Sequence, residues 1–346
     1  MAFTALSKEQ IKKDSEQQLN TFKRTKDFLV AIDTDGCVAD NMNGKQMLIF
    51  QPQYLEFYQL WELESYFREI AEYYNLFSVH RGCNRFLAYQ FTVKALYARK
   101  DVQKIVKEKG IELPDIKALD DYIEFCSKNK LGLGHPSLEK YLDGQPFNLS
   151  LYKLLGWSEA VNRTFPYVNT KIPPFGNVRE SLELMNQYAD VLVVSQTPYD
   201  DLLNYWQDQN IAKYIQIIAG QEMGNKAHHI ASVKKAGGYK DNNVLMLGDA
   251  DGDLKGVKAN NGFFYPILPG FEQNSWNDFP KNFGLFTDGK YAETEKALIK
   301  RFSEVLLPTP PWEKAGYDHV SAYREKQEAR KVLYSKLNPN GRLLKV

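Results

Sequence analysis

Two apolar runs in this sequence each end in closely spaced carboxylates. The runs are Phe28–Ile32 and Val244–Gly248. The residues that follow them are Asp33, Asp35 and Gly36 after the first run, and Asp249, Asp251 and Asp253 after the second. Short aliphatic runs of this kind are typical of buried parallel strands, and ligands of open α/β sheets gather at the carboxyl ends of such strands. Either stretch alone also fits a strand that ends in an Asx turn. Side by side, the two ends would form a carboxylate cluster that binds a hard divalent cation.

Two further residues stand at comparable places along the chain. Ser195 ends the apolar run 191–195, and Lys226 follows the run 215–219. The order Asp33-x-Asp35-Gly36, Ser195, Lys226, Gly248-Asp249-x-x-x-Asp253 resembles the four motifs of the haloacid dehalogenase-like (HAD) hydrolase superfamily. The resemblance covers residues 24–41 and 171–306. It implies an α/β fold, a Rossmann-like core whose parallel sheet is flanked by helices.

Most members of that superfamily resemble phosphatases, and the resemblance implies a role for each motif residue. Asp33 would be the nucleophile that forms an aspartyl-phosphate, which divides a slow hydrolysis into two steps. Asp35 would protonate the leaving group and then deprotonate the attacking water. Ser195 would donate its hydroxyl to a phosphoryl oxygen, and Lys226 would balance negative charge. The backbone amides expected to assist Ser195 are those near Gly36 and Gln196.

A cation would offset the repulsion between a carboxylate and an anionic phosphate. Its expected ligands are Asp33, the backbone carbonyl of Asp35, Asp249 and, directly or through water, Asp253. An all-oxygen site that also uses substrate phosphate favours Mg²⁺. The second acidic turn also matches the start of an EF-hand calcium loop. That alternative fails because Leu254 and Asn260 stand where the loop needs glycine and glutamate.

Other basic residues are candidates for binding an anionic substrate. Lys226 is preferred to Lys234 and Lys235 because it opens a helical pattern directly after a turn. Arg81 and Arg85 are spaced to share one helical face, and guanidinium groups suit anions. A basic cluster at a helix end or on the surface is the simpler explanation of the two arginines.

The chain divides by pattern into a core, residues 1–42 and 171–346, and an insert, residues 43–170. Apolar residues recur at helical intervals through the insert, which predicts a mainly α-helical domain. Its expected helices include residues 54–61, 63–70, 86–99 and 119–127. In the resembling family an insert at this point is a cap that closes over the active site and contacts the substrate. The core is expected to carry an N-terminal helix, capped by Ser7, and a C-terminal helix, residues 319–337. The C-terminal helix is expected to pack through Val320, Tyr323, Val332 and Leu333.

Charge balance, cysteine content and the lengths of apolar runs exclude several classes of protein. Lys and Arg total 44 against 43 for Asp and Glu, so no polyanion-binding surface and no nucleic-acid partner are expected. Its three cysteines, Cys37, Cys83 and Cys126, have no metal-type spacing and fit a reduced, cytoplasmic compartment. No apolar run has signal-peptide or membrane-spanning character. The oligomeric state is left open.

The sequence therefore predicts a Mg²⁺-dependent phosphatase that hydrolyses a small phosphorylated metabolite. A phosphomutase of the same architecture and a non-catalytic metal- or phosphate-binding scaffold are the alternatives. Dehalogenase chemistry is disfavoured, because the resembling dehalogenases usually lack a second aspartate at the position of Asp35.

Overall fold

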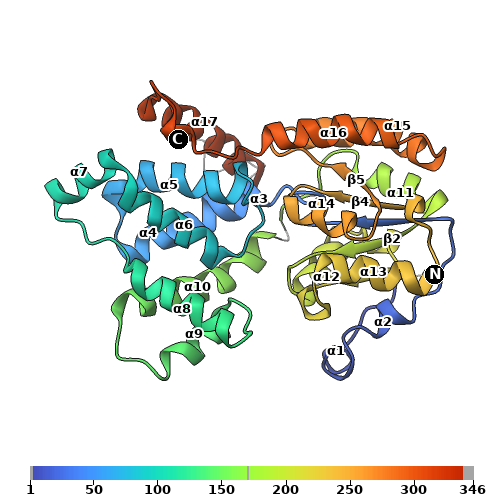
Figure 1. Ribbon diagram of the computed structural model, residues 1–346, viewed down its shortest axis with the longest axis horizontal. Helices are drawn as coiled ribbons and strands as arrows, with labels where there is room; N and C mark the ends of the chain where they lie inside the picture. Colours follow the sequence, from blue (N-terminus) through green and yellow to red (C-terminus); the bar gives the residue numbers. More distant parts are fainter. Residues whose placement is uncertain (1–2, 170, 338–346) are drawn as a thin grey trace. The chain divides into compact units, whose positions relative to one another are not determined.

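The computed structural model describes residues 3–169 and 171–337 and divides into two compact units (Figure 1). One unit holds the residues up to Met42 together with Asn169–Leu306, and the other holds Asn43–Val168 together with the segment from Leu307. The first unit is an α/β core and the second is built from helices. The predicted α/β fold with a separate, mainly helical domain is therefore confirmed.

The core unit contains one sheet of five parallel strands. They are β1 (Phe28–Ile32), β2 (Ala189–Val194), β3 (Ile217–Ala219), β4 (Val244–Gly248) and β5 (Phe263–Pro266). Their order, β3-β2-β1-β4-β5, is the Rossmann-type order, and β1 pairs with both β2 and β4. Ile32 is level with Val193 of β2 and Leu247 of β4. The residues that follow these three strands consequently emerge at one edge of the sheet.

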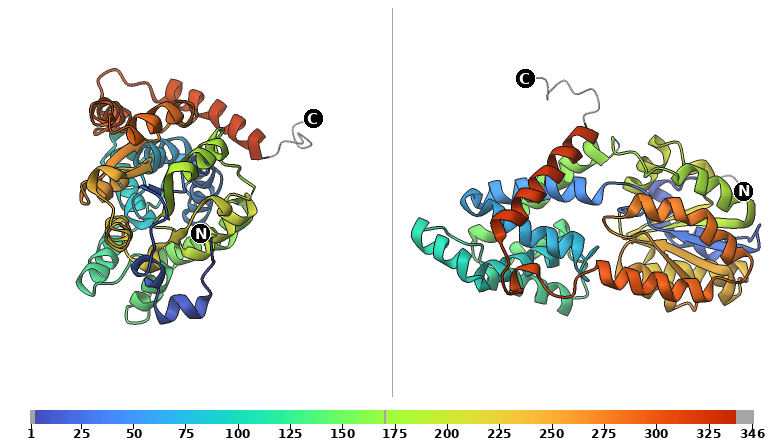
Figure 2. Two further views of the ribbon diagram at one scale, coloured as in Figure 1. Left: turned by 90° about the vertical axis from the view of Figure 1, so that its right-hand side faces the viewer. Right: turned by 90° about the horizontal axis from the view of Figure 1, so that it is seen from above.

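Helices lie on both sides of this sheet (Figures 1 and 2). They are α1 (Lys8–Lys13), α2 (Gln17–Asn20), α11 (Val178–Tyr188), α12 (Tyr199–Asp208), α13 (Lys226–Gly237), α14 (Asp251–Lys258), α15 (Glu272–Thr287) and α16 (Ala292–Val305). Short 3₁₀ turns η4 (Ala212–Tyr214), η5 (Gln221–Met223) and η6 (Asp241–Asn243) precede strands or helices. The predicted capping box of Ser7 is confirmed at α1. Helix α15 was not expected from the sequence; it contains Pro280 and buries Trp276, Phe279 and Phe283 in the core.

The helical unit begins with α3 (Met42–Gly44) and two irregular stretches of π-helix, η1 (Lys45–Phe50) and η3 (Tyr73–Phe77). Its other elements are α4 (Gln51–Tyr58), η2 (Trp61–Leu63), α5 (Glu64–Glu72), α6 (Arg85–Ala98), α7 (Lys100–Lys109), α8 (Ile116–Lys128), α9 (His135–Leu142), α10 (Leu149–Asn169), η7 (Pro311–Glu313) and α17 (His319–Leu337). Its interior is aromatic: Tyr54 stacks on Tyr89 with ring centroids 4.3 Å apart, and Trp157 meets both rings edge-on. In the described part of the chain, no helix combines the length and the apolar character that crossing a membrane requires.

The predicted C-terminal helix is present as α17, and of its expected contact residues Tyr323 does contact a neighbouring helix. Val320 and Val332 are exposed, contrary to the prediction, and the side chain of Leu333 lies outside the described residues. His319 and Tyr323 hydrogen-bond side chains of α5, so this tail belongs with the helical unit and not with the α/β core, where the sequence had put it. The sequence pattern gave the helix correctly, whereas its contact face depended on polar partners far away in the chain.

Asp190, at the start of β2, is hydrogen-bonded to the loop that precedes β1. This fully buried carboxylate accepts hydrogen bonds from the Thr25 and Lys26 amides, at 2.8 and 2.9 Å, and from the Tyr239 hydroxyl, at 2.5 Å. We expect Asp190→Ala to lower the free energy of unfolding by about 2–4 kcal/mol, because buried donors lose their acceptor. Urea denaturation measures this loss. Asp27→Ala, at an exposed position in the same loop, is the control, and an equal effect of both changes would contradict the expectation.

Candidate active site

The loop after β1 is held rigidly by buried side chains from other elements. Gly36 has φ +74°, a left-handed conformation that glycine adopts without strain, and it turns the chain back so that its N–H meets the Ala39 carbonyl at 2.9 Å. Two buried indoles fix the loop: Trp206 donates to the Thr34 hydroxyl and Trp276 to the Cys37 carbonyl, at 3.0 and 2.8 Å. The carboxylates of the loop are thus presented by a fixed backbone.

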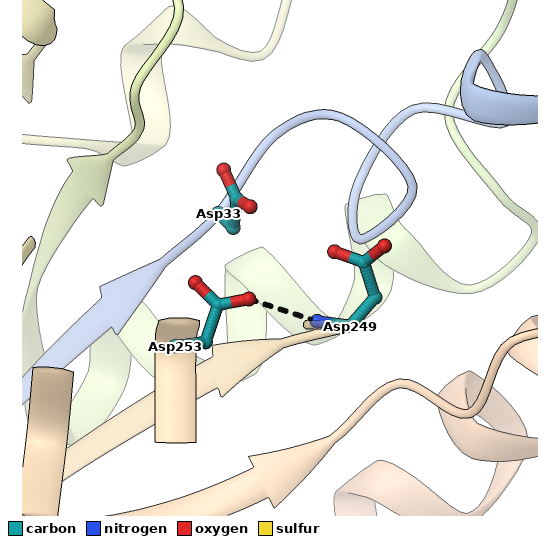
Figure 3. A group of neighbouring side chains, drawn as sticks. All are labelled: Asp33, Asp249 and Asp253. Carbon is teal, nitrogen blue, oxygen red and sulfur yellow. Dashed lines mark hydrogen bonds between the residues drawn. The ribbon is translucent and has the colours of Figure 1, made fainter. Parts of the chain in front are cut away.

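Asp33, Asp249 and Asp253 converge at this edge of the sheet (Figure 3). One carboxylate oxygen of each lies within 4.8 Å of the others, and all three residues are buried. Asp33 follows β1, Asp249 follows the neighbouring β4, and Asp253 lies in the first turn of α14. Gly248 makes this approach possible, because a Cβ at its position would lie 2.3 Å from atoms of the Asp253 side chain. The predicted clustering of Asp33 and Asp249 is confirmed.

Lys226 is the cation inside this acidic cluster. It is the first residue of α13, whose N-cap Asn225 accepts a hydrogen bond from the His228 amide. Its Nζ lies 2.6 Å from Asp33 Oδ2 and 2.5 Å from Asp253 Oδ1. Burial disfavours the charged amine, but the carboxylates of Asp253 and Asp33 outweigh this effect and raise the pKa of Lys226 above its usual range. The ammonium group therefore stays charged.

Asp253 is bonded through both oxygens to groups of the protein. Oδ1 meets Lys226, and Oδ2 accepts the amide N–H groups of Asp249 and Ala250 at 3.2 and 3.0 Å (Figure 3). The side chain has no exposed surface. These contacts orient the turn that carries Asp249. They favour Asp253 as a support of the cluster that reaches a cation through water.

The side chain of Asp35 points to two partners for which the sequence analysis had no role. Asn41 Nδ2 donates to its Oδ1 at 2.5 Å, and Thr197 Oγ1 donates to its Oδ2 at 3.0 Å. Pro198 occupies the N-cap position of α12, and the Thr197 hydroxyl turns toward the acid. Asn41 lies in the same loop as Asp35, whereas Thr197 comes from the loop after β2, so spacing along the chain gives no sign of the Thr197 contact.

The residues expected to bind a phosphoryl group differ in how many of their hydrogen-bonding groups are already bonded within the protein. Ser195 is buried directly after β2; its N–H is bonded to the Ala219 carbonyl at 3.0 Å, and its Oγ accepts the Thr197 amide at 3.3 Å, so the hydroxyl hydrogen can still be donated. The Gln196 side chain donates to the Gly224 carbonyl at 3.1 Å. The N–H of Gly36 bonds the Ala39 carbonyl and, at 3.2 Å, Asn41 Oδ1, so this amide is not free to bind a phosphoryl oxygen, contrary to the expectation.

Arg81 and Arg85 both lie in the helical unit, but the predicted shared helical face is wrong. Arg81 sits in a turn before α6, and its Nη1 donates to the Leu76 carbonyl at 2.9 Å. Arg85 opens α6 and donates to Ser158 Oγ and Asn162 Oδ1, both at 2.9 Å. Among the residues described, no carboxylate pairs with Arg85. Burial lowers its pKa to about 10, which leaves the guanidinium charged at neutral pH.

Comparison with known proteins adds little to this geometry. The sequence matches no protein-family model and no curated protein. Similar solved structures include a haloacid dehalogenase-like family hydrolase from Xanthomonas campestris, with 8% identity over 77% of this chain and 96% of that chain and a TM-score of 0.42. A HAD-superfamily hydrolase of subfamily IA from Geobacter sulfurreducens has 13% identity over 71% and 90%, with a TM-score of 0.37. A hydrolase of the haloacid dehalogenase-like family from Streptococcus pneumoniae has 10% identity over 72% of this chain and 90% of that chain, with a TM-score of 0.36. The assignment of the fold rests on the strand order of this chain itself.

Helix α13, which presents Lys226, also buries His229 completely. Burial, with the neighbouring His228 and Lys226, lowers the pKa of His229 from 6.5 to about 4. The unfolded chain then takes up this proton first, so stability is lost as the pH falls from about 6.5 through about 4. Between pH 7.5 and pH 5 we expect the wild type to lose about 2 kcal/mol more unfolding free energy than His229→Leu. Urea titrations across this range measure both proteins, and parallel pH curves would contradict the assignment.

Proposed function

We propose that this protein is a HAD-like phosphatase that hydrolyses a small phosphorylated metabolite through an aspartyl-phosphate. The observation that carries the proposal is the position of Asp33. It follows the central strand, its Oδ2 is bound by Lys226, and its carboxylate lies within 4.8 Å of those of Asp249 and Asp253. A nucleophilic carboxylate beside a fixed cation and further oxygen ligands matches the needs of phosphoryl transfer, which are charge neutralisation and in-line positioning.

In the first half-reaction, a carboxylate oxygen of Asp33 attacks phosphorus and the bond from phosphorus to the leaving oxygen breaks. Asp35 gives its proton to that departing oxygen, so a neutral alcohol leaves. Lys226 offsets the negative charge shared by Asp33 and the phosphoryl group. The Ser195 hydroxyl, held at the end of β2, is placed to donate to a phosphoryl oxygen.

In the second half-reaction, water attacks phosphorus and passes a proton to Asp35, which has just become ionised. The bond between the phosphoryl group and Asp33 breaks, inorganic phosphate leaves, and Asp35 is again protonated for the next cycle. Asp35 thus acts first as an acid and then as a base. Its carboxylate lies two residues beyond the nucleophile on the same fixed loop.

The donor set of the cluster fits Mg²⁺. The groups available are carboxylate oxygens of Asp33 and Asp249 together with the backbone carbonyl of Asp35, and these hard oxygen ligands leave room for water and a phosphate oxygen. Asp253 would support this site through water, because both of its oxygens are already hydrogen-bonded. When bound, Mg²⁺ would supply the positive charge that lets an anionic carboxylate approach an anionic phosphate.

Arg85 remains the candidate in the helical unit for binding an anionic part of the substrate. Its hydrogen bonds go to the neutral oxygens of Ser158 and Asn162, and no carboxylate within the described residues pairs with it, so an anionic group of a ligand would supply the opposite charge. Arg81 is a weaker candidate, since its buried guanidinium is already bonded to the Leu76 carbonyl.

Metal binding by the cluster has a direct test in thermal stability. We expect Mg²⁺ to raise the stability of the wild-type protein, by about 2.7 kcal/mol at a concentration of one hundred times the dissociation constant. Asp249→Asn should lose this Mg²⁺-dependent rise, because it removes a charged ligand. Asp251→Asn is the matched control: Asp251 belongs to the same acidic turn but pairs with Lys255 at the surface. Thermal unfolding with Mg²⁺ and with a chelator measures the difference, and an undiminished rise in Asp249→Asn would contradict the ligand assignment.

Catalysis is tested with p-nitrophenyl phosphate and a panel of phosphorylated sugars, nucleotides and organic acids. With Mg²⁺ we expect Asp33→Asn to lower kcat by more than about 10³-fold, since no other carboxylate can form the covalent intermediate. Asp251→Asn should stay within about twofold of the wild type, as a surface ion pair contributes little. Equal activity of Asp33→Asn and wild type would sink the nucleophile assignment. A wild type inactive on the whole panel would instead favour a binding scaffold, and phosphoryl transfer to a second sugar without phosphate release would indicate a mutase.

A further inference from the structure

The carboxylate of Asp35 is held at both oxygens by different kinds of partner. Oδ1 accepts from the Asn41 side-chain amide at 2.5 Å, and Oδ2 accepts from the Thr197 hydroxyl at 3.0 Å. Asn41 is completely buried, while Asp35 and Thr197 are partly exposed. The partner of Oδ1 is therefore fixed inside the protein, and the partner of Oδ2 lies nearer to the surface.

The orientation of the Asn41 amide is dictated by its neighbours. The Gly36 N–H can only donate, and it lies 3.2 Å from the Asn41 side-chain oxygen Oδ1. Nδ2 of Asn41 then faces Asp35 and, at 2.8 Å, the side-chain oxygen of Asn169. Both hydrogens of Nδ2 have acceptors, and exchanging its nitrogen and oxygen would set two donors against each other at Gly36. The Asn41 side-chain amide therefore has only one orientation that satisfies its hydrogen bonds.

This arrangement gives the two oxygens of Asp35 different anchors. The Asn41 amide that holds Oδ1 is itself fixed inside the protein by Gly36 and Asn169. The Thr197 hydroxyl that holds Oδ2 belongs to the loop after β2, so two separate segments of the chain orient the carboxyl group.

We propose that Asn41 and Thr197 are positioning residues for Asp35, with Asn41 holding Oδ1 and Thr197 holding Oδ2 so that the carboxyl group keeps one orientation on its loop. This inference rests on the phosphatase function proposed above, which requires Asp35 to act as acid and base. Asn169 has a supporting part, because it takes up the second hydrogen of the Asn41 amide. Asn41 lies just before the inserted helical segment and Asn169 lies at its end. The two places where the chain passes between the units therefore both contribute a residue to the network that orients Asp35.

The loop that carries Asn41 has no other evident reason to bury an amide at this place. Its backbone is already fixed by the Gly36 turn and by the indoles of Trp206 and Trp276. Within the described residues, the Asn41 side chain hydrogen-bonds Gly36, Asp35 and Asn169. Its effect is therefore concentrated on the acid and on the two backbone segments beside it.

The test compares leaving groups in the Mg²⁺-loaded, full-length protein. An alkyl phosphate needs its leaving oxygen protonated, whereas p-nitrophenyl phosphate needs little proton donation. For Asn41→Ala we expect single-turnover release of the leaving group to fall about 10–100-fold with an alkyl phosphate from the active panel, and much less with the aryl phosphate. KM should change by less than about twofold, since Asn41 binds no part of the substrate.

Thr197 supplies a second pair of variants that keep the fold. Thr197→Val retains the shape and removes the hydroxyl, and it should show the same selective loss with the alkyl phosphate. Thr197→Ser retains the hydroxyl and should restore most of the rate. Rates that depend on side-chain shape, with Thr197→Val near wild type and Thr197→Ser reduced, would overturn the role of the hydroxyl.

A double-variant cycle separates positioning from general damage. In an Asp35→Asn background, where the acid is already absent, Asn41→Ala should cause little further loss with the alkyl phosphate, in contrast to its about 10–100-fold effect when Asp35 is present. An equal loss in both backgrounds, or an equal loss with both leaving groups, would show a structural effect and overturn the proposal. If the wild type proves inactive, the proposed function fails and this inference falls with it; an active wild type with unaffected Asn41→Ala refutes the positioning role alone.

Discussion

The ion pairs of Lys226 are the interaction on which the rest of the site depends. Asp33, Asp249 and Asp253 are buried within a few ångströms of one another, and like charges held so closely in a low-dielectric interior repel strongly. Lys226 bonds Asp33 and Asp253 at the same time, so one ammonium compensates the two carboxylates that face it. Removing one member of such a buried group leaves an uncompensated charge, which costs several kcal/mol. In the proposed function, a divalent cation would bind beside these carboxylates and offset their negative charge.

These charged side chains are positioned by segments whose backbone conformation is tightly restricted. Asp33 and Asp249 come from the ends of adjacent parallel strands, and their separation is set by strand spacing and register. Gly248 lets Asp253 approach β4 where any side chain would collide. The indoles of Trp206 and Trp276 hold the loop after β1 from the core. A site on such supports is preorganised, so little reorganisation is needed when charge develops on a phosphoryl group.

The two units have different interiors. In the core unit, Lys226 pairs with two buried carboxylates at one edge of the sheet. The helical unit is centred on aromatic rings, and its Arg85 guanidinium lies over the ring of Trp157 and donates to neutral oxygens. The same unit holds Arg99 in a buried ion pair with Glu69, so it accommodates arginine side chains both through ring contacts and through ion pairs.

By itself, the sequence determined the parts of the protein that follow from local pattern. Apolar runs placed β1 and β4 at the residues where they are found, and the motif order selected Asp33, Asp249 and Lys226, because a strand followed by a polar turn is encoded within about ten neighbouring residues. Only the tertiary structure decided which other side chains contact those residues. It separated Asp253, inside the cluster, from Asp251, paired with Lys255 at the surface, and it assigned the C-terminal helix to the helical unit. It also brought Thr197, from the loop after β2, to Asp35. That contact joins segments far apart in the chain, and a hydrogen bond between such segments leaves no periodicity in either one from which it could be foreseen.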